Sequence, residues 1–211
     1  MADGATESSY AGVWARLLVE RFAAGEIELA TAADFLSDVA SLESLWRGAV
    51  LTPNLPWFAE EKILQGASAA FLGLTLAGEQ GALAWRAVAV GDACLALVRD
   101  GELLQSFPWE RAEDLGSRPV LLSSAPRNRT RLLEHVRLTG GPCAPGDELF
   151  LMTDGLARWF LESYAGGDKP WHILAGIASD SEEQFAPWVA ELREAGVMRN
   201  DDVTLTALRI P

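Results

Sequence analysis

The chain has 211 residues, of which 49% are apolar and 22% charged, and its mean hydropathy is +0.10. This length and composition predict one globular domain over residues 1–211 and exclude a membrane-spanning or a disordered protein. Seventeen Lys and Arg against 30 Asp and Glu give a formal net charge of −13. A negative field repels nucleic-acid phosphates and anionic lipid, so we expect neither nucleic acid nor a membrane as a partner.

Cysteine and histidine are scarce. Two of each are too few for a disulfide framework or for a zinc site rich in Cys or His. No apolar run approaches the ~20 residues of a spanning helix. The first four residues, Met-Ala-Asp-Gly, contain neither a basic region nor an apolar signal core. These features predict a cytoplasmic protein.

Three helices are predicted at the start of the chain, because apolar side chains recur there at spacings of three and four. They cover residues 8–24, 31–46 and 56–64. Ser8 or Ser9 is expected to cap the first helix, and Gly25 to end it.

Short apolar stretches divided by glycines then predict consecutive antiparallel strands. They cover residues 69–76, 83–90 and 94–98. Asp100-Gly101 predicts a two-residue hairpin into a fourth strand at 102–106. Residues 107–128 contain three prolines, which predicts a long irregular connection.

The last third of the chain returns to helices. A strand is predicted at 131–138 and another at 148–153, the latter buried on both faces because its central residues are all apolar. Ser181 and Gln184 form a capping box for the last helix. The predicted helices cover 155–162, 169–178 and 181–195, and a strand at 203–210 closes the chain. This order of elements predicts an α+β domain in which antiparallel sheet is covered by helices.

Acidic residues stand at four boundaries of these elements: Asp3, Asp92, Asp154 and Asp201. Asp-Gly pairs are common turn formers, so each position alone has a purely structural explanation. Carboxylates at strand ends can also converge on one edge of a sheet, and several close carboxylates need a compensating cation. Oxygen ligands without cysteine, and with few histidines nearby, favour Mg²⁺ or Mn²⁺ over zinc.

Four motifs, in order along the chain, resemble those of the metal-dependent protein phosphatases of type 2C, the PPM family. Residues 145–156, PGDELFLMTDGL, resemble the signature in which an apolar strand runs into Ser or Thr before Asp-Gly-Leu. The segments 2–5 (ADGA), 90–103 (VGDACLALVRDGEL) and 200–205 (NDDVTL) resemble three further motifs. Together they span essentially the whole chain, and four weak motifs in the family's order are more specific than any one of them.

The resemblance implies an αββα sandwich of two antiparallel sheets flanked by helices, with a binuclear Mg²⁺ or Mn²⁺ site at one end. By the same resemblance Asp3 bridges the metals, Gly4 offers its carbonyl, Asp154 and Asp201 complete the first ion's shell, and Asp92 helps to hold a third ion. Asp3, Asp154 and Asp201 are then the catalytic set. The implied reaction is hydrolysis of phosphoserine or phosphothreonine in a phosphoprotein by a metal-activated water.

The motifs depart from the family at the start of the chain. Family members usually begin with a strand pair that carries a phosphate-binding arginine and an acidic ligand for the second metal. We therefore expect a gene product that begins upstream, an N-terminally truncated fold in these 211 residues, and an incomplete metal site with weak activity. Asp202 also stands where the family has asparagine.

Two other interpretations stay open. The chain can be a catalytically weak or inactive phosphatase-fold module that regulates a protein partner. It can also be an acidic α+β protein without a site, whose Asp-Gly pairs are only turns.

Overall fold

The computed structural model describes residues 1–52, 57–78, 83–116, 119–125, 129–180 and 182–211. The chain forms two compact units. The first comprises Met1–Leu76, Trp85–Gly91 and Pro119–Gly141, and the second Ala77–Ala84, Asp92–Arg118 and Pro142–Pro211. The single domain expected over residues 1–211 stays a prediction.

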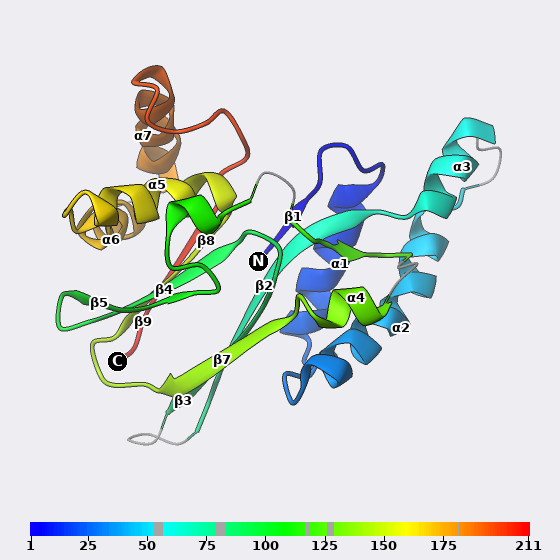
Figure 1. The fold of residues 1–211 in the computed structure, drawn as a ribbon, viewed down its shortest axis with the longest axis horizontal. Helices are drawn as coiled ribbons and strands as arrows, with labels where there is room; N and C mark the ends of the chain where they lie inside the picture. The colour runs from blue at the N-terminus through cyan, green and yellow to red at the C-terminus, as the bar shows by residue number, and fades with distance from the viewer. Residues whose placement is uncertain (53–56, 79–82, 117–118, 126–128, 181) are drawn as a thin grey trace. The chain divides into compact units, whose positions relative to one another are not determined.

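The first unit builds one sheet and covers it with helices (Figure 1). The sheet order is β1-β2-β3-β7, and β6 also pairs with β2. The strands are β1 (Ala2–Gly4), β2 (Ser68–Ala77), β3 (Ala84–Val90), β6 (Leu122–Ser123) and β7 (Arg137–Pro142). The helices are α1 (Ala11–Ala23), α2 (Ala32–Val50), α3 (Trp57–Gln65) and the short α4 (Arg129–Leu133).

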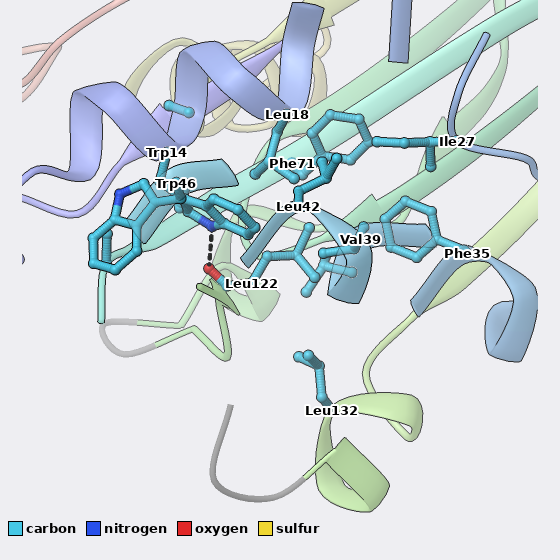
Figure 2. Packing of buried hydrophobic residues seen from close by; sticks show 14 of the residues in the cluster. Trp14, Leu18, Ile27, Phe35, Val39, Leu42, Trp46, Phe71, Leu122 and Leu132 are labelled. Carbon is cyan, nitrogen blue, oxygen red and sulfur yellow. Dashed lines mark hydrogen bonds between the residues drawn. The ribbon is translucent and has the colours of Figure 1, made fainter. Parts of the chain in front are cut away.

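Large aromatic side chains fill the core between these helices and the sheet (Figure 2). Trp14 of α1 and Trp46 of α2 are fully buried beside Phe35 and Phe71, and the rings of Phe35 and Phe71 stack at 5.8 Å. The indole Nε1 of Trp14 donates a hydrogen bond of 3.0 Å to the carbonyl of Leu122 in β6. Burial of these large apolar side chains supplies most of the stability of a helix-on-sheet layer. The hydrogen bond satisfies the one polar atom of the Trp14 indole.

The second unit builds a four-stranded antiparallel sheet in the order β5-β4-β8-β9. Its strands are β4 (Cys94–Arg99), β5 (Glu102–Phe107), β8 (Glu148–Met152) and β9 (Leu205–Arg209). Its helices are η1 (Ala112–Asp114, a 3₁₀ turn), α5 (Asp154–Ala165), α6 (Pro170–Asp180) and α7 (Glu182–Glu194). Side chains of α5, α6 and α7 pack on β4 and β8 in one buried cluster. Figure 1 shows the path of these three helices.

Several predicted features are confirmed. The central residues of β8, Leu149 to Met152, are buried, as the continuous apolar run predicted. Asp100 and Gly101 both have positive φ, 53° and 73°, which is the backbone of a two-residue hairpin with the twist of its strands. Gly25 follows the end of α1 with φ 75°, where a side chain would be strained.

Two predicted elements are wrong. Residues 131–138 are not one strand, because α4 runs to Leu133 and β7 begins only at Arg137. Between them the N–H groups of His135 and Val136 donate to the carbonyls of Leu132 and Leu133, which makes a turn. Strands β3 and β4 are consecutive in the chain but belong to different sheets, since β4 pairs with β5 and β8 instead.

Ser8 does not cap α1. Tyr10 occupies the cap position in a left-handed conformation, and the Ser8 hydroxyl accepts the N–H of Ser68 at 3.0 Å instead. The capping box expected at Ser181 lies outside the described residues. Across the described ranges, no helix has the length and apolar content that a bilayer span requires.

Candidate functional site

Asp154 lies where the buried strand β8 gives way to the helix α5. Thr153 caps α5 with an extended backbone, and Asp154 is the first helical residue. A carboxylate in the first turn is favoured by the positive end of the helix dipole. The N–H of Gly155 donates to Asp154 Oδ1 at 2.7 Å, and no described residue donates a hydrogen bond to Oδ2. One oxygen of this half-buried carboxylate is thus left for another ligand.

Hydrogen bonds of Thr153, the residue before Asp154, hold the segment that follows Asp201. The N–H of Thr153 donates to the carbonyl of Thr204 at 3.2 Å, and its hydroxyl accepts the N–H of Thr204 at 2.9 Å. The same hydroxyl donates to the carbonyl of Asp202 at 3.3 Å. These three bonds extend the β8–β9 ladder by one pair, and we call them the Thr153 lock. The lock holds Asp201 and Asp154 at the same end of the sheet.

The two carboxylates interact electrostatically. Burial raises the pKa of Asp154 above its ordinary value, and the negative charge of Asp201 raises it further. The N–H of Gly155 and the positive charges of Arg158 and Arg199 act in the opposite direction. A carboxylate whose charged form is disfavoured by burial and by a second carboxylate is stabilised by a bound cation.

Asp201 is exposed in the turn that leads from α7 to β9. Its Oδ1 accepts the N–H of Asp202 at 2.9 Å, and its backbone carbonyl accepts a hydrogen bond from Arg193 near the end of α7. Its carboxylate can therefore turn toward a ligand while the backbone beneath it is held.

Asp3 and Gly4 lie on β1 in the first unit. Asp3 is opposite Ala70 and Gly4 opposite Ala69 in the antiparallel pair with β2. A Cβ atom on Gly4 would lie 2.9 Å from the Cβ of Ala11, the first residue of α1, so the helix can start here only over a glycine. The predicted run of the first Asp-Gly motif into a helix is confirmed.

Strand β2 has β1 on one side and β3 on the other, and Gly91 directly follows the end of β3. Its φ is 105°, and a Cβ atom there would lie 2.7 Å from the Cβ of Ala70. Ala70 therefore has Asp3 on one neighbouring strand and Gly91 on the other. Asp92 follows Gly91 directly and is half-buried.

These positions can be compared with the predicted metal site. Across the parts of the chain that the structure describes, no three His, Cys, Asp or Glu side chains are grouped closely enough to hold a metal ion. In the second unit, Asp154 and Asp201 are a mutually repelling pair of carboxylates. Their oxygen atoms are the ligand type that a hard divalent cation prefers, but two carboxylates are fewer ligands than such an ion takes. The convergence of Asp3, Gly4 and Asp92 with this pair stays a prediction.

Sequence reasoning missed the residues that position the pair. Thr153 lies inside a quoted motif but was not assigned a function there. Arg158, Arg193 and Arg199 lie on α5, on α7 and in the turn before β9. The pairing of β8 with β9 brings the segment of Arg199 and Asp201 to the end of β8 where Asp154 lies. The available signal was positional, since Arg193 and Arg199 both precede Asp201 by eight residues or fewer in an otherwise acidic chain.

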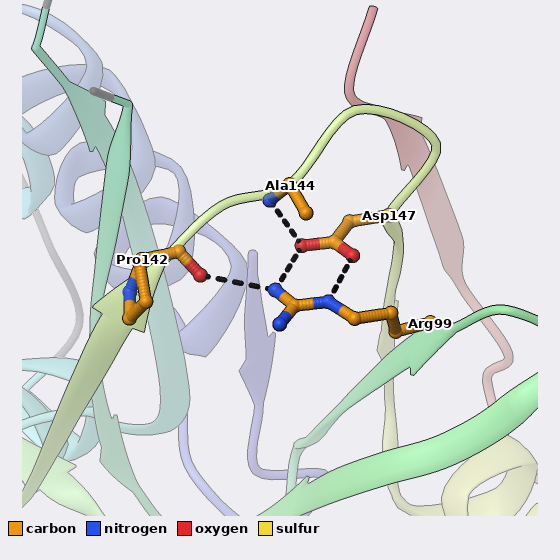
Figure 3. A network of polar contacts seen from close by, with 4 residues as sticks. All are labelled: Arg99, Pro142, Ala144 and Asp147. Carbon is orange, nitrogen blue, oxygen red and sulfur yellow. Dashed lines mark hydrogen bonds and ion pairs between the residues drawn. The ribbon is translucent and has the colours of Figure 1, made fainter. Parts of the chain in front are cut away.

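A second polar feature fixes the opposite end of β8 (Figure 3). Arg99 of β4 donates two hydrogen bonds of 2.7 Å to the carboxylate of Asp147, which is 1% exposed, and a third of 3.2 Å to the carbonyl of Pro142. The N–H of Ala144 also donates to Asp147, at 2.8 Å. Hydrogen bonds from Arg99 lower the pKa of Asp147 most, and its burial opposes them.

Asp147→Asn is expected to reduce the free energy of unfolding at pH 7 by about 2 kcal/mol, because charge-assisted hydrogen bonds are lost. The native pKa of Asp147 lies below the unfolded value, so the stabilisation is complete above about pH 4 and is lost as the pH falls through the native pKa. Urea unfolding at pH 7 and at pH 3 should therefore show a difference between wild type and variant that shrinks in acid. A difference that is equal at both pH values would contradict this assignment. Asp114→Asn, in an exposed pair with Arg111, is the control and should change little.

The fold is that of the metal-dependent serine/threonine phosphatases of type 2C. The catalytic domain of serine threonine protein phosphatase PstP, in complex with two manganese ions, matches with a TM-score of 0.58 and 20% identity over 100% of this chain and 86% of that chain. PstP/Ppp of Mycobacterium tuberculosis gives a TM-score of 0.57 with 19% identity, over 99% and 86%. The photosystem II phosphatase PBCP gives 0.54 with 17% identity, over 100% and 85%.

Sequence comparison alone does not reach this result. No protein-family model matches the chain, and no curated protein matches it at a significant level. The structural likeness confirms the predicted fold class and the resemblance drawn from the four motifs. At 20% identity and below it establishes the fold, and the activity has to be argued from the residues.

Proposed function

We propose that this chain is a Mg²⁺- or Mn²⁺-dependent phosphatase that hydrolyses phosphoserine or phosphothreonine in cytoplasmic phosphoproteins. The observation that carries the proposal is the pairing of Asp154 with Asp201. The Thr153 lock holds these two carboxylates at one end of neighbouring strands in a chain with the type 2C phosphatase fold. A half-buried carboxylate that is repelled by a second, exposed carboxylate is stabilised by a divalent cation.

Each residue then has a proposed role. Asp154 and Asp201 would hold a metal ion, and Asp3, the carbonyl of Gly4 and Asp92 would supply the further oxygen ligands of the site. When bound, the ions supply an activated water and neutralise charge on the phosphoryl oxygens. The Gly155 N–H fixes the orientation of the Asp154 carboxylate, and Arg193 fixes the backbone of Asp201, so both ligands are positioned in advance.

The proposal is tested by adding Mn²⁺ to the metal-free protein. A ligand at 100 times its dissociation constant stabilises the folded state by about 2.7 kcal/mol, so the melting temperature should rise by several degrees. Hydrolysis of a phosphothreonine peptide should appear over the same Mn²⁺ range. The reference is Ca²⁺ at the same concentration, because its larger ionic radius suits a six-coordinate site for a smaller ion poorly.

The outcomes separate the interpretations. A Mn²⁺-dependent rise in melting temperature together with hydrolysis supports the enzyme. A rise without hydrolysis would favour the regulatory module, in which the metal only stabilises the fold. An unchanged melting curve and no hydrolysis would contradict the proposed function.

A further inference from the structure

Three arginines lie around the Asp154–Asp201 pair, and their guanidinium groups are used differently. Arg158, one helical turn after Asp154, donates to the carbonyls of Ala112 and Leu115 at 3.2 and 2.7 Å. Its guanidinium donors are therefore already hydrogen-bonded, and they hold η1 against α5. This arginine has a structural function and little capacity left for a ligand.

Arg193 has a structural function as well. It donates to the backbone carbonyl of Asp201, and its Nε is buried without a hydrogen-bond partner among the described residues. A guanidinium that is packed in this way fixes the turn before β9. It cannot leave the turn for a ligand without releasing Asp201.

Arg199 differs from both. Its side chain is exposed, and it makes no hydrogen bond or ion pair with any residue of the described ranges. Its positive charge nevertheless acts on the Asp154 carboxylate. Arg199 is thus the member of the three whose donors are available.

The backbone holds Arg199 in this position from both sides. Before it, Met198 is buried, and the N–H groups of Val197 and Met198 both donate to the carbonyl of Leu192 at the end of α7. After it, the N–H of Asp201 donates to the carbonyl of Arg199 at 3.1 Å, and the Thr153 lock fixes the segment that follows. The exposed side chain therefore extends from a fixed turn beside the two carboxylates.

We propose that Arg199 binds the phosphoryl group of the substrate at the Asp154–Asp201 pair. This inference rests on the proposed phosphatase function. A phosphate monoester carries about two negative charges near neutral pH and is repelled by carboxylates, so a cation beside the metal ligands favours its entry. A guanidinium is suited to this, because its planar fork can donate two parallel hydrogen bonds to two phosphate oxygens, whereas a lysine offers a point charge.

The test compares Arg199→Ala and Arg199→Lys with wild type in the presence of Mn²⁺. For Arg199→Ala, KM for a phosphothreonine peptide is expected to rise about tenfold, with kcat changed less than about threefold, since a group that holds the phosphate equally before and during reaction contributes to binding. The dissociation constant of inorganic phosphate, measured by titration calorimetry, should rise by about the same factor. Arg199→Lys should recover part of both losses.

The controls separate binding from folding. Arg209→Ala removes an exposed arginine at the far end of β9 and should leave KM and phosphate affinity unchanged. The melting temperature of Arg199→Ala, and its rise with Mn²⁺, should equal those of wild type, because the side chain supports no described contact.

An active wild type whose Arg199→Ala variant keeps KM and phosphate affinity within twofold would overturn the role of Arg199 and leave the phosphatase intact. A fall in kcat alone would overturn it equally. A wild type that neither binds Mn²⁺ nor hydrolyses the peptide would remove the proposed function, and the inference with it.

Discussion

Asp154→Asn is expected to lose at least about 100-fold in Mn²⁺-dependent hydrolysis and most of the Mn²⁺-induced rise in melting temperature. The physical reason is the loss of a charged oxygen ligand at the centre of the proposed metal site. In metal-free buffer the same variant should melt at the same or a higher temperature. Burial and the charge of Asp201 disfavour the ionised carboxylate, and the neutral amide removes that cost. Calorimetry with and without Mn²⁺, and peptide hydrolysis, measure both effects.

The opposite signs of these two effects make the experiment specific. A merely structural aspartate would lower the melting temperature in both buffers when it is replaced. Asp100→Asn is the matched control, since Asp100 lies in the hairpin at the Glu148 end of the sheet, and asparagine tolerates its positive φ. It should retain activity and the Mn²⁺ response. Full activity in Asp154→Asn would contradict the proposed role of Asp154.

Trp14→Ala is expected to reduce the free energy of unfolding by about 3–5 kcal/mol, the range found for aromatic side chains removed from a packed core. Trp14 is 0% exposed, lies among the aromatic rings of the first unit, and satisfies the carbonyl of Leu122 (Figure 2). Trp14→Phe should recover part of the loss, because it restores apolar volume but leaves that carbonyl without its donor. Urea unfolding measures all three proteins.

Trp57→Ala is the matched control for the core tryptophan. Trp57 is 76% exposed on α3, so the same change of side chain should alter the free energy of unfolding by less than about 1 kcal/mol. Equal losses at the two positions would show that Trp14 is not the packing centre of the first unit.

Local patterns in the sequence predicted the elements whose causes are local. Asp100-Gly101 formed the expected hairpin because both residues tolerate positive φ, and β8 is buried on both faces as its apolar run required. The segment 131–138 was wrongly assigned as one strand because its short mixture of apolar and polar residues fits a strand as well as a short helix followed by a strand. The partners of β4 could not be predicted from its own residues, since pairing depends on contacts with β5 and β8.

The candidate site divides in the same way. Asp154 and Asp201 were found because their motifs surround them with turn and strand residues of recognisable type. Arg193 and Arg199 were not found, because their function depends on where a helix end and a turn pass beside β8 in space. Their side chains carry no sequence pattern of their own.

The Thr153 lock has a consequence for motion. Asp154 follows Thr153 directly, and Asp201 immediately precedes Asp202, whose carbonyl the lock holds. The backbone segments that carry the two carboxylates therefore cannot drift apart by independent loop fluctuations on fast timescales. Separating them requires the end of β9 to peel from β8, an opening that breaks all three bonds together and costs part of the cooperative stability of the sheet. Amide hydrogens at Thr153 and Thr204 then exchange with solvent only through that rare opening, although Asp201 itself is exposed.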